Sequence, residues 1–136
     1  MAKVALGVAA FIVAAHGLIH LMGLVAYWPL AEMKELPYKT TLFGDRWEVS
    51  RAGMRLFSVL WLLAAVGFVA AVGGWLADRP WAAALMAGAA VLSLVICLAD
   101  WSAAWRGALI SFVILGVSVV ALGLDMKPAR FPAYVE

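Results

Sequence analysis

The sequence predicts an all-α integral membrane protein, a four-helix bundle that runs up-down-up-down. Composition is the first reason: 67% of the 136 residues are hydrophobic and only 13% are charged, whereas soluble domains contain about 45–50% apolar and roughly 25% charged residues. The second reason is that the apolar residues form runs close to the roughly 20 residues that a helix needs to cross a bilayer. None of these runs alternates between apolar and polar residues as a membrane β-strand would.

The predicted membrane helices cover residues 4–28, 54–75, 81–99 and 107–124. The first run is longer than the about 7–15 apolar residues of a signal-peptide core, so we expect it to be retained as a helix. Residues 29–53 form a long polar loop, here called loop one, while the other connections are short. Short connections favour antiparallel neighbours. We therefore expect a single membrane domain with both termini on the same side.

Loop one contains two local signals. Glu32–Leu36 is long enough for a short interfacial helix, which Pro37 would end. Asp45 is followed three residues later by Glu48, the spacing of a capping box, which predicts that the second helix begins near Asp45. The polar, proline-containing tail after Leu124 predicts a segment on the surface.

Lysine and arginine near the helix ends indicate the orientation. Six of these residues lie on the side of loop one and of the third connection, and four lie on the side of the termini. This distribution favours a cytoplasmic location for loop one and the third connection. The formal charge of +2 and the lack of a basic stripe argue against a nucleic-acid partner, so the expected partner is the lipid bilayer.

The scarce polar residues of the helices are predicted to gather in the half of the bilayer next to loop one. His16 and His20 lie four residues apart and therefore share a helix face. On the third helix Ser93, Cys97 and Asp100 share a face in the same half, and Ser111 enters it from the fourth. A charge facing lipid would cost about 2.5–3.5 kcal/mol at the bilayer centre, so we expect these groups to point inward. They predict a polar pocket that opens toward loop one.

Small residues are expected where helices approach closely. The candidates for such contacts are the glycines at seven positions: Gly7, Gly17, Gly23, Gly67, Gly73, Gly88 and Gly116.

The histidine pair has two interpretations. In the first, two neutral imidazoles hydrogen-bond neighbouring helices and hold the bundle together. In the second, they bind a metal ion such as Zn²⁺ or Cu²⁺ or a quinone headgroup, or they form part of a proton path. A metal ion is possible because imidazoles on adjacent turns can chelate one metal. The candidate third metal ligands are Glu48, Asp100 and Cys97. Because Cys97 is the only cysteine, the chain cannot perform dithiol exchange by itself.

Two arginines complete the candidate binding residues, which are His16, His20, Arg51, Arg55 and Asp100. Arg51 and Arg55 could clamp an anionic headgroup, or they could extend to the lipid headgroups. Asp100 could orient a histidine, or it could end the third helix in an ion pair with Arg106.

The stretches HGLIHLMG (residues 16–23) and DWSAAWRG (residues 100–107) resemble small uncharacterised bacterial four-helix membrane proteins that are often labelled permease-like. The size and layout are also similar to the DoxX-like group, whose members associate with quinone or thiol redox systems. A further likeness, in RWEVSRAGMR (residues 46–55), is to the membrane glutathione transferase-like family of eicosanoid metabolism. The resemblance to bacterial proteins implies an inner-membrane location.

Three functions remain open at this point. The protein could bind a metal, a quinone-like molecule or another lipid-soluble ligand in its pocket. It could be an accessory subunit of a larger complex or a homo-oligomer without chemistry of its own. It could also be a membrane enzyme that acts on a lipophilic substrate.

Overall fold

The computed structural model describes residues 1–125. The tail from residue 126, which we predicted to lie on the surface, is outside the described residues. The described chain consists of helices and one small hairpin, in the order α1 (Ala2–Ile19), α2 (Leu21–Tyr27), β1 (Thr41–Leu42), β2 (Trp47–Glu48), α3 (Ser50–Leu76), α4 (Ala82–Ala99) and α5 (Trp101–Asp125).

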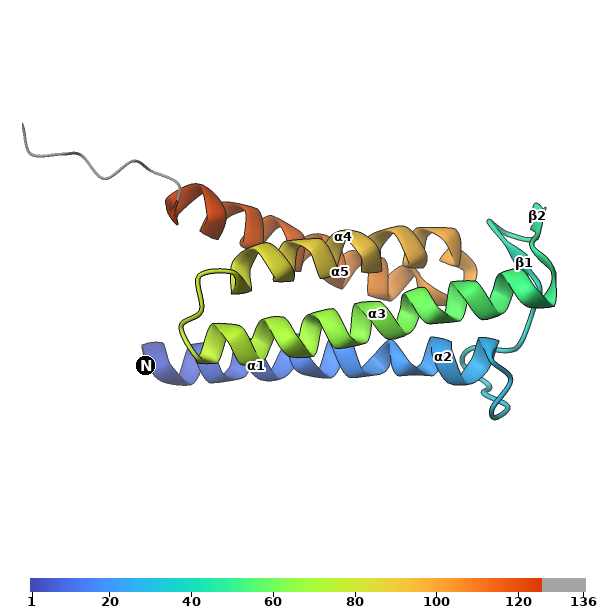
Figure 1. Ribbon diagram of the computed structural model, residues 1–136, viewed down its shortest axis with the longest axis horizontal. Coiled ribbons are helices and arrows are strands. Elements are labelled where there is room, and N and C mark those ends of the chain that lie inside the picture. Colours follow the sequence, from blue (N-terminus) through green and yellow to red (C-terminus); the bar gives the residue numbers. More distant parts are fainter. Residues whose placement is uncertain (126–136) are drawn as a thin grey trace, which may run out of the picture.

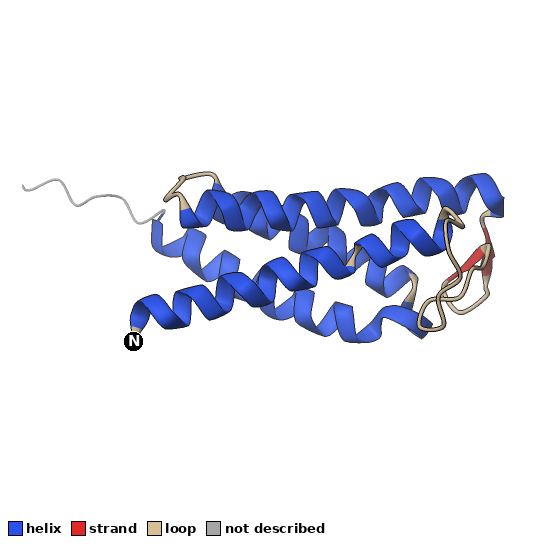
Figure 2. Ribbon diagram, turned by 90° about the horizontal axis from the view of Figure 1, so that it is seen from below, coloured by secondary structure: helices blue, strands red, loops and turns tan. Residues whose placement is uncertain are grey.

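The helices form an antiparallel four-helix bundle, which confirms the predicted fold class. The spans Val4–Tyr27, Ser50–Leu76, Ala82–Ala99 and Trp101–Leu124 are long and apolar enough to cross a membrane. In Figure 1, α1 and α2 lie end to end along α3, and α4 and α5 lie above them. The N-terminus and the end of α5 lie at the same end of the bundle, as predicted, and the β1–β2 hairpin lies at the opposite end (Figures 1 and 2).

The first membrane span contains a break at His20 that does not change its direction (Figure 2). The backbone N–H of His20 donates to Gly17 O at 3.1 Å, and that of Gly23 donates to His20 O at 3.0 Å. Both bonds connect residues three apart, as in a 3₁₀ turn, which is tighter than an α-helical turn. Such a turn within a helix often accompanies a functional position, and here it holds one of the two histidines.

Three local predictions are wrong. Residues 32–36 form no helix, and Asp45 caps none: it lies in the hairpin turn with a φ of 64°. Instead α3 begins at Ser50, and Glu48 Oε1 accepts the backbone N–H of Ser50 at 2.9 Å. The third connection is also shorter than expected, because Asp100 is the only non-helical residue between α4 and α5.

Close helix contacts occur at three of the seven candidate glycines. A Cβ at Gly17 would lie 2.6 Å from Phe68 Cβ, one at Gly23 would lie 2.1 Å from Trp61 Cδ2, and one at Gly67 would lie 3.1 Å from Ala89 Cβ. The sites where a Cβ would meet nothing within 4 Å are Gly7, Gly73, Gly88 and Gly116. The first two contacts place α1 and α2 tightly against α3, on the side where the histidines lie.

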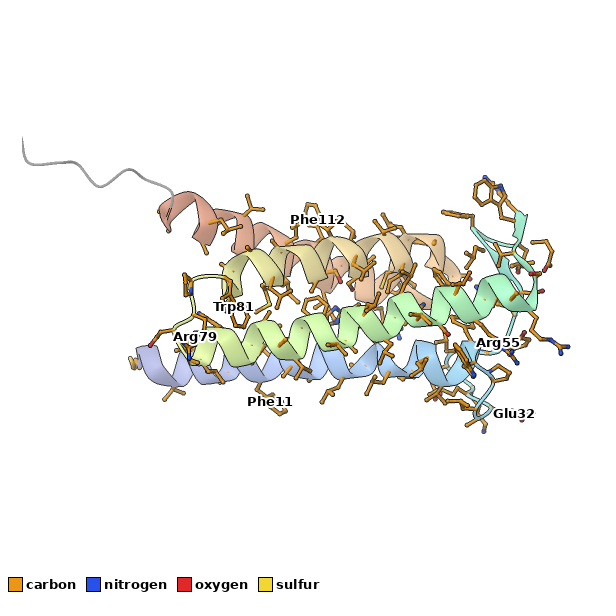
Figure 3. All side chains as sticks on the ribbon, viewed as in Figure 1. Phe11, Glu32, Arg55, Arg79, Trp81 and Phe112 are labelled. Carbon is orange, nitrogen blue, oxygen red and sulfur yellow. The ribbon has the colours of Figure 1, made fainter. Side chains whose placement is uncertain are left out.

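Large apolar side chains cover the outside of the bundle. Phe11 on α1 and Phe112 on α5 project outward in Figure 3 and are 74% and 66% exposed. Charged residues lie near the ends instead, with Arg55 near the hairpin and Arg79 in the turn between α3 and α4 (Figure 3). An apolar belt between charged ends is the surface that a bilayer requires.

Candidate functional site

A continuous chain of polar side chains crosses the buried centre of the bundle. His16 Nε2 lies 3.0 Å from Ser111 Oγ on α5, and Ser111 Oγ lies 2.6 Å from Ser93 Oγ on α4. Ser93 Oγ in turn lies 2.6 Å from His20 Nε2. All four residues are buried. The chain therefore links the first membrane span to both α4 and α5, and we call it the His–Ser chain.

Aromatic rings hold the two imidazoles in place. The His16 and His20 rings meet edge to face with centroids 4.8 Å apart. Phe68 lies 5.3 Å from the His16 ring, and Trp61 lies 5.3 Å from the His20 ring. These two aromatic residues are the ones that approach Gly17 and Gly23. Because these two glycines have no side chain, α3 packs closely enough for Phe68 and Trp61 to approach the histidine rings.

A second polar cluster surrounds Asp100 at the loop-one end. Tyr27 donates a hydrogen bond to Asp100 Oδ2, and Lys39 forms an ion pair with Oδ1. Asp100 is fully buried, whereas the Lys39 side chain is 20% exposed. Lys39 also donates to Ser102 Oγ at 3.3 Å. The buried carboxylate thus has a charged partner, as burial of an ion requires.

The Asp100 cluster also anchors loop one to the bundle. The backbone N–H of Phe43 donates to Ala99 O at 2.8 Å, next to Asp100. The alternative pairing of Asp100 with Arg106 does not form, because Asp100 pairs with Lys39 instead and the Arg106 guanidinium lies 5.1 Å from the centre of the Trp105 ring. Asp100 therefore connects loop one to the junction of α4 and α5 and does not join the histidines.

The structure does not bring the predicted arginines to the His–Ser chain. Arg51 and Arg55 are exposed, and the Arg55 guanidinium lies 5.7 Å from the centre of the Trp28 ring. Their position matches the interpretation in which they extend toward lipid headgroups.

Two of the candidate third metal ligands, Glu48 and Asp100, lie apart from the histidines. Glu48 is exposed in the hairpin, where it accepts a hydrogen bond from Thr40 at 3.1 Å. Cys97 is buried beside the His–Ser chain, because a Cβ at Gly107 would lie 2.9 Å from Cys97 Sγ and 4.0 Å from His16 Cε1. Among residues 1–125 there is no group of three or more His, Cys, Asp or Glu placed to hold a metal ion. The structure therefore gives the histidine pair no third protein ligand.

An apolar cavity of about 300 Å³ lies between α1, α4 and α5, with Trp75 of α3 at its wall. Val13 and Ile114 line it, and they precede His16 and follow Ser111 by three residues, about one helical turn. Its polar lining residue, Ser118, donates its hydroxyl to Ile114 O at 2.8 Å. The sequence predicted a polar pocket open toward loop one, but this cavity is apolar and extends toward the termini.

Two partners escaped the sequence analysis. Lys39 lies in a loop with no periodic pattern, so nothing in the sequence indicates that it reaches Asp100. Tyr27 lies seven residues after His20, and helical spacing predicts that it extends the face of the histidine pair, but this spacing does not indicate its bond to Asp100. The bond between Ser93 and Ser111 depends on the packing of α4 against α5.

Comparison with models of protein families, with curated proteins and with solved structures finds no match for this chain. The fold and site themselves define it as a bundle of four apolar, membrane-length helices with a buried His–Ser chain.

Proposed function

We propose that this protein binds a small lipophilic molecule from the bilayer, with its apolar part in the cavity and its polar group at His16. The observation that carries the proposal is the adjacency of the cavity to the His–Ser chain, one turn away on both α1 and α5. Ligand sites are typically apolar hollows of about 300–1,000 Å³ with a few polar groups that fix orientation. The cavity and His16 combine these two features.

The packing of the helices supports entry from the membrane. α1 packs mainly on α3, and α5 packs mainly on α4, whereas α1 and α5 contact each other little. The bundle is therefore least closed along the α1–α5 seam, which the cavity follows. A molecule dissolved among the acyl chains reaches this seam without crossing water. The resemblance to bacterial four-helix proteins supports an inner-membrane location.

Photolabelling with a small lipophilic probe tests the proposal. We choose a trifluoromethyl-diazirine benzyl alcohol, added to the full chain in lipid nanodiscs, with labelled residues mapped by mass spectrometry. Ala83→Phe places a ring in the cavity, because Ala83 lines it. The matched control is Ala84→Phe, the next residue of α4, which is exposed.

We expect saturable labelling of the cavity segments of α1 and α5. It should fall at least about tenfold in the Ala83→Phe variant, equivalent to ~1.4 kcal/mol of binding free energy, and persist in the Ala84→Phe variant. Labelling that is unsaturable, or equal in both variants, contradicts the proposal and leaves the histidines as hydrogen-bonding links between helices.

A further inference from the structure

The segment between α2 and α3, residues 29–49, crosses the loop-one end of the bundle and contains the β1–β2 hairpin (Figures 1 and 2). We call it the strap. Apart from bonds at its two ends, its hydrogen bonds to the described helices all reach the α4–α5 junction. Lys39 forms its ion pair with Asp100 there. The backbone N–H of Phe43 donates to Ala99 O at 2.8 Å. The middle of the strap is therefore attached to the bundle at one place.

The strap buries few apolar side chains. Its two buried residues are Leu36 and Leu42, which belong to the same apolar cluster as Tyr27 and Met54. The other side chains of the strap are exposed or half-buried. Segments with few buried apolar contacts open at a lower free energy than core helices do. We therefore expect the strap to separate from the bundle before the helices separate from each other.

Hydrogen bonds within the strap hold its hairpin half together. The backbone N–H of Val49 donates to Thr40 O at 2.9 Å, and the Thr40 hydroxyl donates to Glu48 at 3.1 Å. The strands β1 and β2 pair with each other in the same region. None of these bonds involves the bundle, so all of them can survive when the strap is released.

The ion pair of Asp100 separates a closed position of the strap from an open one. Asp100 is fully buried under the strap, and a buried charge requires a partner. In the closed position that partner is Lys39. When the strap lifts, Lys39 leaves with it and water reaches the carboxylate, while Tyr27 remains because it belongs to α2. A partly lifted strap would leave the carboxylate buried and unpaired, which disfavours intermediate positions.

From these contacts we propose that the strap opens and closes over the loop-one end of the bundle as one unit, with the ion pair of Lys39 and Asp100 as its latch. Opening exposes Asp100 and the α4–α5 junction to the aqueous phase while the four membrane spans stay packed. The proposal does not depend on ligand binding at the cavity, which extends toward the termini.

Two thiols in one molecule separate opening of the strap from opening of the bundle. Leu42→Cys places a thiol at a buried position of the strap, and the natural Cys97 is buried within the bundle. The full chain in detergent micelles is treated with a maleimide, and mass spectrometry gives the labelling rate of each thiol. We expect the introduced thiol to react faster than Cys97, because the strap opens without the helices.

A substitution in the bundle should affect Cys97 alone. In Gly17→Ala the new Cβ lies 2.6 Å from Phe68 Cβ, and Phe68 belongs to a second apolar cluster that contains no strap residue. This variant should therefore speed the labelling of Cys97 and leave the rate of the introduced thiol unchanged.

A substitution at the latch should release the strap. Lys39→Met should speed the labelling of the introduced thiol at least about tenfold, because removal of one partner of a buried ion pair is strongly destabilising. The matched control is Lys34→Met, at an exposed lysine of the same strap, which should not change this rate. Addition of Asp100→Asn to Lys39→Met removes the unpaired charge, so the rate should fall again.

Two results would overturn the proposal. If both thiols respond in the same proportion to Gly17→Ala, the strap opens only together with the bundle. If Lys39→Met and Lys34→Met give the same rate for the introduced thiol, the ion pair is not the latch. Hydrogen exchange checks the natural chain without an introduced thiol. The Phe43 N–H should exchange faster than the amide hydrogens in the middle of α3 and α4, and equally slow exchange would contradict independent opening.

Discussion

Replacement of Gly23 by alanine should destabilise the bundle because the new methyl group would overlap the Trp61 ring. The Cβ would lie 2.1 Å from Trp61 Cδ2 and 2.3 Å from Cγ, whereas carbon atoms in contact prefer about 3.5–4.0 Å. The indole must therefore retreat by more than about 1 Å. Its retreat is opposed by the rings of Tyr27 and Phe57, both centred 6.3 Å away, and by His20.

The magnitude follows from a matched comparison with Gly7→Ala. Gly7 lies in the same membrane span, and a Cβ there meets nothing within 4 Å. Both substitutions gain the same helix propensity, up to about 1 kcal/mol, so the difference between them isolates the steric cost. Overpacking of this kind costs typically 1–3 kcal/mol. We expect a value toward the upper end of about 3 kcal/mol, because the contact falls on the fused ring atoms rather than on a flexible chain end.

The single cysteine provides the assay. Cys97 is only 1% exposed, so in detergent micelles a thiol-reactive maleimide labels it when the bundle opens. If opening is in fast equilibrium, 1–3 kcal/mol raises the labelling rate of Gly23→Ala about 5- to 150-fold over that of Gly7→Ala. Trp61→Leu should remove most of this difference. Equal labelling rates of the two alanine variants would refute the reasoning, as would an unchanged difference in the Trp61→Leu background.

Two further predictions concern the polar clusters. Lys39→Met should destabilise the bundle by several kcal/mol more than Asp100→Asn does. It leaves a fully buried carboxylate without its cation, and breaking a buried pair costs about 3–5 kcal/mol. Faster Cys97 labelling in Asp100→Asn than in Lys39→Met would show that the ion pair is not formed. Ser93→Ala breaks two links of the His–Ser chain and should cost about 1–3 kcal/mol. Ser118→Ala removes a hydroxyl that bonds within its own helix, so it should leave the Cys97 labelling rate almost unchanged.

The helices could be predicted from the sequence because their signal is local. Each apolar run specifies its own span, and the bilayer requires a helix within it. The predicted helix boundaries were wrong where long-range contacts determine the residue at which a helix begins. Asp45 has the spacing of a helix cap, but β1 pairs with β2 and draws it into a hairpin turn. No property of the run around Asp45 indicates that pairing.

Part of the site could also be predicted, because helical periodicity is a local signal. His16 and His20 share a face by helical periodicity alone, and that face is indeed buried. One of the two interpretations of Arg55 placed it with the histidines, but it lies near the helix start, where its guanidinium lies 5.7 Å from the centre of the Trp28 ring. Periodicity gives the face on which a residue lies, and it does not give the distance along the bundle at which two helices meet.

The sequence by itself determined the composition of the surface, the number of membrane-length helices and the inward position of the histidines, because these follow from the cost of exposing polar groups to lipid. Only the tertiary structure decided the partners. The rotation and depth at which α4 and α5 pack against the first span join His16 to Ser111 and His20 to Ser93, while Asp100 is placed with Lys39. A hydrogen bond requires its atoms to lie within about 3 Å, and such a position depends on every helix contact at once.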